Sequence, residues 1–230
     1  AFVKCILKLS KLEYMRGISP AETLALQREA IEMINQSNLT GEDALLFLYA
    51  GMGEHFGGEL ERGETLRAKG IKYLKEFNYL DLESEAVPLI VWHYYLSGDL
   101  KRTIGYYESY LIPIESRSDE EIMAYPSVIF SYFLIGEYSR ALILCENIYK
   151  KALRLHDRVA ANLMLAISGR IRTYMGDMDN AENILYEAYA EARELKYGWG
   201  LYYALFGICF FQYQKGNYEA SREAMYLARR

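Results

Sequence analysis

The stretch GRIRTYMGDMDNAENILYEA, residues 169–188, decides the fold, because it contains small residues at intervals of seven, five and seven: Gly169, Gly176, Ala181 and Ala188. This spacing predicts a helix, a tight turn and a second helix folded back on the first. Small residues let two antiparallel backbones approach closely, so Gly169 and Ala181 are expected at the helix crossing and Gly176 at the end of the first helix. Asp177 is expected to cap the second helix.

The same spacing recurs along the chain. It returns in full at Gly51, Gly58, Gly63 and Gly70, and the turn glycine also returns at Gly98, Gly136 and Gly216. Successive turn glycines, counted from Gly58, are 40, 38, 40 and 40 residues apart. A constant period of this kind predicts a solenoid of stacked helical hairpins.

Helical apolar spacing, glycine stops and polar linkers divide the chain into six hairpins, and no stretch reads as a strand. The hairpins are expected at residues 2–36, 42–76, 82–112, 118–154, 158–195 and 199–230. We therefore predict an all-α, right-handed superhelical array of twelve helices that forms a single domain over residues 1–230. Solenoids usually carry polar terminal caps, and neither end of this chain has one, so we expect it to be a fragment of a longer multidomain protein.

Composition narrows the class of protein. The net charge is −5, and the 26 basic residues are scattered among 31 acidic ones, so we expect no direct binding of nucleic acid by this segment. Cys5, Cys145 and Cys209 lie far apart in apolar helical patterns, where free cysteine behaves as a small hydrophobe, which favours a cytoplasmic setting. An apolar run of transmembrane length and a clear signal peptide are both absent from the sequence, so no membrane partner is expected.

Residues that carry catalysis or bind metals show no suitable pattern. His55, His93 and His156 are dispersed without paired spacing, so no metal site is predicted. The acidic runs at 59–64 and 119–121 lie at expected helix starts, where negative charge suits the helix dipole. The sequence contains no phosphate-binding loop and no nucleophile elbow. We therefore predict no enzyme activity, no catalytic residue and no cofactor.

The pattern at residues 169–188 resembles the tetratricopeptide repeat, whose unit has small residues at repeat positions 8, 20 and 27 and a turn at 15 and 16. The resemblance is specific for residues 158–195, good for 42–76 and partial elsewhere. A period of about 40 also fits HEAT or armadillo arrays, but the small residues favour the tetratricopeptide repeat. Long, glycine-marked repeats look like the sensor region of MalT-like transcription activators of the LuxR type, in which a small inducer binds the array between an ATPase module and a helix-turn-helix.

The resemblance also implies a binding face, because first helices line the concave side through repeat positions 2, 5, 9, 12 and 13. Position 9 reads Met52, Trp92, Phe130, Arg170 and Phe210; position 12 reads His55, Tyr95, Phe133, Thr173 and Tyr213; position 5 adds Phe206. Such aromatic faces suit a sugar, nucleobase-like or peptide ligand, and Arg170 can hold a carboxylate or phosphate. The alternative is that these rings fill the core of a tightly wound superhelix.

Three functions remain open from the sequence. In the first, this is a ligand-sensing domain of a bacterial transcription regulator, whose inducer binds the aromatic face and controls self-association. In the second, it is a protein-interaction scaffold that holds a peptide or partner helix in its groove. In the third, it is a spacer that contacts other domains of the same chain. Position 9 has no asparagine and position 5 reads Leu48, Pro88 and Phe206, which sets aside the tetratricopeptide class that clamps chaperone tails.

Overall fold

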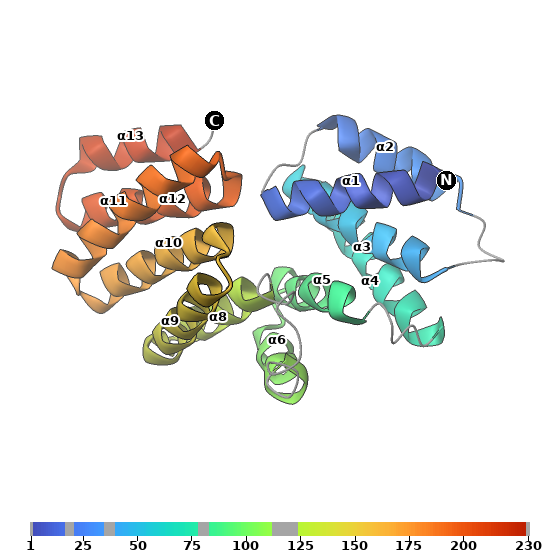
Figure 1. Cartoon of the computed structure of the whole chain (residues 1–230), viewed down its shortest axis with the longest axis horizontal. Helices are drawn as coiled ribbons and strands as arrows, with labels where there is room; N and C mark the ends of the chain where they lie inside the picture. Colours follow the sequence, from blue (N-terminus) through green and yellow to red (C-terminus); the bar gives the residue numbers. More distant parts are fainter. Residues whose placement is uncertain (1, 17–20, 35–39, 78–82, 112–123, 229–230) are drawn as a thin grey trace. The chain divides into compact units, whose positions relative to one another are not determined.

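The computed structural model describes residues 2–16, 21–34, 40–77, 83–111 and 124–228, and its regular elements within these ranges are all helices (Figure 1). They follow one another in pairs: α1 (Phe2–Arg16) and α2 (Ala21–Glu32), α3 (Gly41–Phe56) and α4 (Leu60–Phe77), α5 (Glu83–Leu96) and α6 (Leu100–Tyr106) with its π-helical end η3 (Tyr107–Leu111), α8 (Tyr125–Leu134) and α9 (Tyr138–Arg154), α10 (Arg158–Met175) and α11 (Met178–Leu195), and α12 (Gly198–Gln214) and α13 (Tyr218–Ala228). The prediction of twelve helices in hairpins is confirmed. The acidic run at 119–121 lies outside the described residues.

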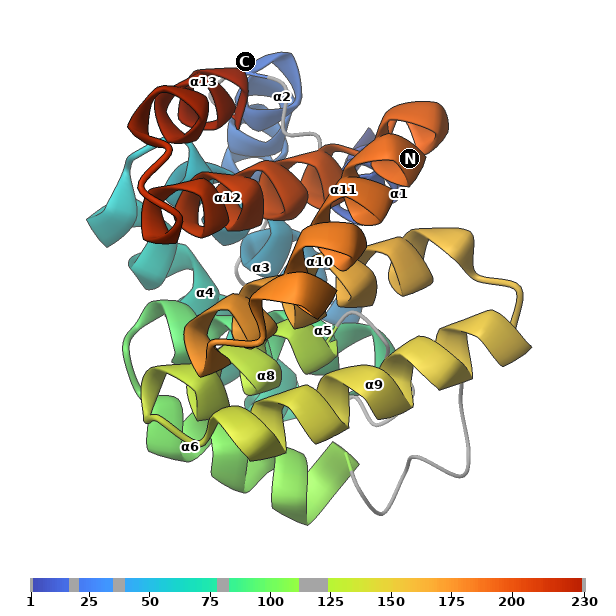
Figure 2. The same cartoon turned by 90° about the vertical axis from the view of Figure 1, so that its left-hand side faces the viewer.

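The chain divides into two compact units, Ala1–Ala124 and Tyr125–Arg230. The N-terminal unit contains α1 to α6 with η3, and the C-terminal unit contains α8 to α13. Figure 2 looks onto the C-terminal unit, whose helices follow one another from α8 and α9 in yellow-green to α13 in red. That residues 1–230 form a single domain stays a prediction.

The turn of the best-conforming hairpin is built on Gly176. This residue ends α10 with a φ of 82°, in the left-handed region, and its N–H donates to the carbonyl oxygen of Thr173 at 3.2 Å. Glycine adopts this conformation without steric cost, and the other four turn glycines do the same. The prediction from the repeated spacing is therefore confirmed at the level of the backbone.

The expectation that the Asp177 side chain caps the second helix is wrong. Asp177 occupies the N-cap position of α11, but its side chain makes no capping hydrogen bond. Its carboxylate instead accepts from Nη1 of Arg172 at 2.7 Å and from Nδ2 of Asn180 at 2.8 Å. The hydrogen bond from Arg172 is the largest cause that lowers the pKa of Asp177, as expected for a carboxylate paired with a guanidinium.

Close helix crossings explain the remaining small residues. A Cβ atom on Gly169 would lie 2.8 Å from Cγ of Leu185, and one on Gly51 would lie 2.7 Å from the carbonyl oxygen of Gly63. Both distances are too short for a real carbon atom. The helices α10 and α11, and likewise α3 and α4, can therefore cross this closely only because Gly169 and Gly51 have no side chain. Leu185 also packs against Gly207 on α12, where a Cβ atom would clash with it in the same way. The repeat pattern did not predict this contact.

The cysteines differ from one another in burial. Cys145 is fully buried, its thiol lies 3.0 Å from the carbonyl oxygen of Met164, and burial raises its pKa. Cys209 is half-buried, whereas Cys5 is exposed. The expectation that all three act as small hydrophobes is wrong for Cys5, because its position on α1 faces solvent.

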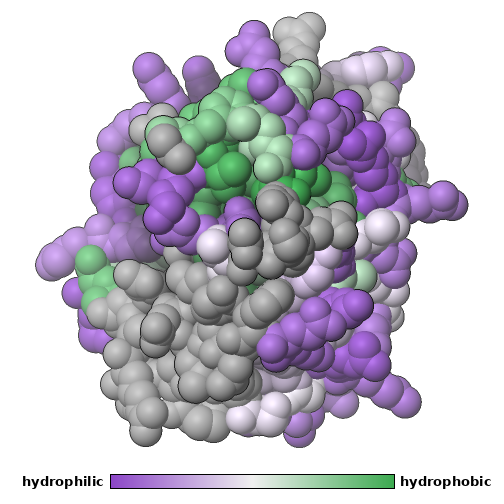
Figure 3. All heavy atoms as spheres, turned by 90° about the vertical axis from the view of Figure 1, so that its right-hand side faces the viewer, coloured by the Kyte–Doolittle hydropathy of each residue, from purple (hydrophilic) through white to green (hydrophobic). Residues whose placement is uncertain are grey.

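The described helices do not include one with the length and apolar character needed to cross a bilayer. Figure 3 shows one face of the molecule, on which hydrophobic residues gather in a patch with hydrophilic side chains on either side. Apolar surface of this kind is common on folded domains, because polar atoms never cover a protein completely.

Candidate ligand-binding face

The predicted site residues fall into both units. Met52, His55, Trp92 and Tyr95 lie in the N-terminal unit, and the others lie in the C-terminal unit: Phe130, Phe133, Arg170, Thr173, Phe206, Phe210 and Tyr213.

In the N-terminal unit, the predicted residues lie mostly inside. Met52 and Trp92 belong to the hydrophobic core and are only 2% and 7% exposed. The ring of Tyr95 meets that of Trp92 edge-on at 5.4 Å between centroids. His55 is half-buried, and burial followed by the charge of Arg67 lowers its pKa. These side chains pack the unit, and their assignment to a ligand stays a prediction.

A buried arginine lies where α3 and α4 cross in this unit. Arg67 is 1% exposed, and its Nη1 donates to the carbonyl oxygen of Gly51 at 2.8 Å. Its Nε–H donates to Nδ1 of His93 at 3.4 Å. Burial lowers the pKa of Arg67 to about 10, and burial together with the charge of Arg67 lowers the pKa of His93 to about 4. His93 is therefore a neutral acceptor inside the unit, and no motif in the sequence predicts this role of Arg67.

A second charged cluster joins α2, α3 and α4. The Glu54 side chain is fully buried, and its two carboxylate oxygens accept from Nε and Nη2 of Arg28 at 2.7 and 2.6 Å. Nε of Arg62 lies 2.9 Å from the same carboxylate. A buried carboxylate held by two arginines fixes the positions of the helices that carry them. We assign this cluster to the packing of the unit.

In the C-terminal unit, the first helices of the three hairpins bring aromatic rings around one arginine. The guanidinium carbon of Arg170 on α10 lies 5.6 Å from the ring centroid of Phe130 and 5.2 Å from that of Phe133, both on α8. It lies 4.6 Å from the ring of Phe206 on α12. All three distances are in the range of cation–π attraction. The register thus places four of the predicted residues together.

The rings extend beyond this group. Tyr174 stands edge-on to Phe133 at 4.6 Å and stacks on Phe210 at 4.1 Å with an interplanar angle of 11°. Phe130 stacks on Tyr203 at 5.1 Å. Tyr174 and Tyr203 were missed as site residues, although they occupy repeat positions 13 and 2 of the register that found the others. We call these residues with Arg170 the aromatic face: Phe130, Phe133, Arg170, Tyr174, Tyr203, Phe206 and Phe210.

Arg170 has no carboxylate partner among the residues that the structure describes, and its Nε is buried without a hydrogen bond. Arg172, two residues later on α10, differs. Its Nη2 pairs with Glu146 at 2.6 Å and its Nη1 with Asp177 at 2.7 Å, although its Nε is also unpartnered. Leaving a buried donor unpaired costs about 1–3 kcal/mol. The guanidinium of Arg170 therefore carries a charge that no acidic side chain of the described residues neutralises.

Thr173 and Tyr213 lie apart from this group of contacts. The Thr173 side chain is buried, and its hydroxyl donates to the carbonyl oxygen of Gly169 at 3.0 Å, within its own helix. Tyr213 is 57% exposed, and its ring lies 5.7 Å from that of Tyr218. Both residues keep their register positions at the end of their helices, and their contact with a ligand stays a prediction.

Comparison with known proteins supports the fold. No protein-family model and no curated protein matches the sequence. The structure is similar to the crystal structure of a Rap protein complexed with competence and sporulation factor, with a TM-score of 0.71 and 17% identity over 97% of this chain. The fold is a tetratricopeptide-like helical repeat. This chain spans 61% of the length of that Rap protein chain. At this identity the likeness concerns the fold, and the closer resemblance to MalT-like sensors stays a prediction.

Proposed function

We propose that this chain is a regulatory recognition module that binds an extended peptide, or an extended segment of a protein, on its aromatic face. The observation that carries the proposal is the guanidinium of Arg170, which lies among three phenylalanine rings without a carboxylate partner in the described residues. The similar Rap structure, which is complexed with competence and sporulation factor, supports recognition of a partner by this fold.

The chemistry of the face defines the ligand. Aromatic rings bury a large area at a low cost in side-chain entropy, and the arginine fork pairs with a planar carboxylate through two parallel hydrogen bonds. The ligand should therefore present a carboxylate, from Asp, Glu or a free C-terminus, next to an aromatic or aliphatic side chain. The rings beside Arg170 exclude water from the ion pair and strengthen it.

A displayed peptide library selected against the purified chain tests this proposal. We expect enrichment of peptides with an acidic group beside an apolar residue, and at least about a tenfold weaker binding to Arg170→Gln. Arg170→Lys keeps the charge but loses the planar fork, so it should recover only part of the affinity. Arg154→Gln, which removes an exposed arginine of α9, is the matched control. Peptides that bind Arg170→Gln as tightly as the unaltered chain would refute the proposal.

A small anionic inducer is the second candidate, because three rings within 5.6 Å of one guanidinium also suit a planar acid. In this case the chain would be the sensor domain of a transcription regulator. We would then also expect a cytoplasmic location, contacts with other domains of the same chain, and self-association. Thermal shift against sugars and metabolic acids separates the two. Stabilisation by a small acid that disappears in Arg170→Gln, together with a library that yields no peptide, would favour the inducer.

A further inference from the structure

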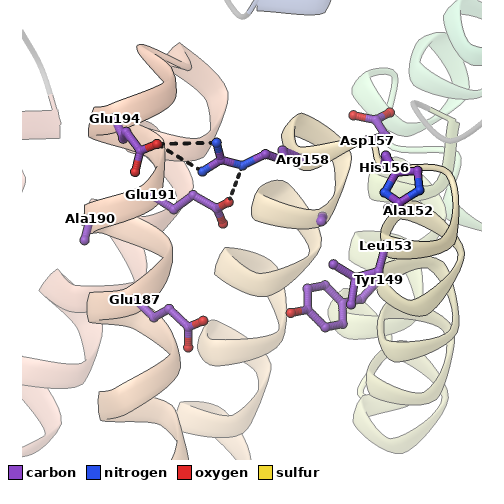
Figure 4. Close-up of a pocket in the computed structure, with 11 residues that line it drawn as sticks. Tyr149, Ala152, Leu153, His156, Asp157, Arg158, Glu187, Ala190, Glu191 and Glu194 are labelled. Atoms are coloured by element: carbon purple, nitrogen blue, oxygen red, sulfur yellow. Dashed lines mark hydrogen bonds and ion pairs between the residues drawn. The ribbon is translucent and has the colours of Figure 1, made fainter.

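A groove of about 620 Å³ lies on a different part of the C-terminal unit, between α9 and α11 and over the start of α10 (Figure 4). Its floor and sides are formed by small or aliphatic residues and one aromatic ring. Its polar rim contains four carboxylates, one guanidinium and one imidazole, those of Asp157, Glu187, Glu191, Glu194, Arg158 and His156. The volume is within the range of binding pockets for small ligands or side chains.

The chain itself fills one end of this groove with an arginine. Nε of Arg158 lies 3.2 Å from the carboxylate of Glu191, and its Nη2 lies 3.3 Å from that of Glu194, as the dashed lines in Figure 4 show. Glu191 and Glu194 are one turn apart on the same face of α11. This end of the groove therefore already shows how the glutamates of α11 hold a guanidinium.

The other end of the groove carries one carboxylate and one tyrosine ring. Glu187 lies four residues before Glu191, which is one turn or about 6 Å along the helix, and it has no ion pair within the described part of the chain. Tyr149 on α9 points toward Glu187 across the groove (Figure 4). Burial, and then the charges of Glu187 and Glu191, raise the pKa of the Tyr149 hydroxyl, in keeping with its position beside these carboxylates.

We propose that this end of the groove binds an arginine side chain from a protein partner, with its guanidinium paired with Glu187 and stacked on the ring of Tyr149. The argument is charge complementarity: four carboxylates and one guanidinium line the groove, and Asp157 accepts from the N–H of Ala160 while Arg158 pairs with Glu191 and Glu194, which leaves the charge of Glu187 for a ligand. Arginine is preferred to lysine because its planar group stacks on an aromatic ring and pairs with a carboxylate at the same time. The alanines at 152, 161 and 190 leave room for its apolar stem.

An NMR titration of the full chain with the capped peptide Ac-Gly-Gly-Arg-Gly-Gly-NH2 tests this site. We expect shift changes in the amides of α9 and α11, and at least about fivefold weaker binding of the same peptide with citrulline, which has the shape of arginine without its charge. Glu187→Gln should weaken binding of the arginine peptide by a similar factor. Tyr149→Ala should weaken it about threefold through loss of the ring.

The controls separate this site from unspecific attraction and from the aromatic face. Glu223→Gln, which removes an exposed glutamate of α13 outside the groove, and Arg170→Gln should both leave binding unchanged. Equal binding of the citrulline peptide, or equal weakening by Glu223→Gln, would overturn the proposal. Tighter binding of spermidine than of the arginine peptide would overturn the assignment to a protein side chain. Circular dichroism of each variant shows that a loss of binding is not a loss of fold.

Discussion

Replacement of Arg170 by methionine separates a ligand-binding arginine from one that serves packing. The replacement keeps an unbranched side chain of similar volume, although methionine is shorter than arginine. It removes the attraction of the guanidinium to three rings, at 4.6–5.6 Å, which is worth about 0.5–1 kcal/mol for each well-placed ring. It also removes the buried, unpaired Nε, which costs the folded state about 1–3 kcal/mol.

These two contributions nearly cancel, so we expect the free energy of unfolding of Arg170→Met to lie within about 1 kcal/mol of the unaltered value. Urea denaturation followed by circular dichroism measures it, and binding of a selected acidic peptide should fall at least about tenfold. Arg172→Met is the matched variant on the same helix. It breaks ion pairs to Glu146 and Asp177 and should lose more stability while binding is retained. A large loss of stability in Arg170→Met with unchanged binding would refute the reasoning.

Three further predictions concern the fold. Leu185→Ala should lower the free energy of unfolding by about 2–5 kcal/mol, measured in urea, because Leu185 is fully buried between two helices; a loss below about 1 kcal/mol would contradict this packing. The hydrogen bond from Arg28 lowers the pKa of Glu54 below its ordinary value of 4.5, so its contribution to stability is present above that pH and is lost as the pH falls through the lowered pKa. Glu54→Gln should therefore lose stability at neutral pH, and its melting temperature should fall less steeply as the pH is lowered. A melting temperature with the same pH dependence as that of the unaltered chain would argue against this role. Gly176→Ala should cost about 1–2 kcal/mol by the same urea assay because of its left-handed backbone, and an unchanged midpoint would exclude a strained turn.

The fold could be predicted from the sequence because its determinants are local. A left-handed turn and a close crossing each require glycine or another small residue at a fixed spacing, so the period is visible in the chain itself. The predicted hairpin at 158–195 has the ends that the structure gives to α10 and α11. The error at Asp177 has a different origin. Its carboxylate can accept a hydrogen bond either from the start of α11 or from Arg172, and the sequence pattern does not show where the Arg172 side chain lies.

The candidate site was predictable in part for the same reason. Repeat register brought Phe130, Phe133, Arg170 and Phe206 together, because equivalent positions on successive first helices share one face. Register does not show which arginine has an acidic partner, since that depends on where α9 places Glu146. Nor does it distinguish a ring on a binding face from one in the core, since Phe130 and Phe133 are 4% and 6% exposed and the equivalent Trp92 is 7% exposed.

Hairpin α10–α11 supports both proposed binding regions, and its packing explains why they select opposite charges. Leu185 fills the space left by Gly169 on one side and by Gly207 on the other, which fixes α11 against α10 and α12. Arg170 follows Gly169 and lies among rings from the neighbouring first helices, where no carboxylate of the described chain reaches it. Glu187 follows Leu185 by two residues and lies beside Tyr149 of another second helix, where the guanidinium of Arg158 is shared by Glu191 and Glu194. Among the described residues, the hairpin thus carries a cation on its first helix and an anion on its second that have no ion-pair partner, and these opposite charges are the reason that the two proposed sites would select different ligands.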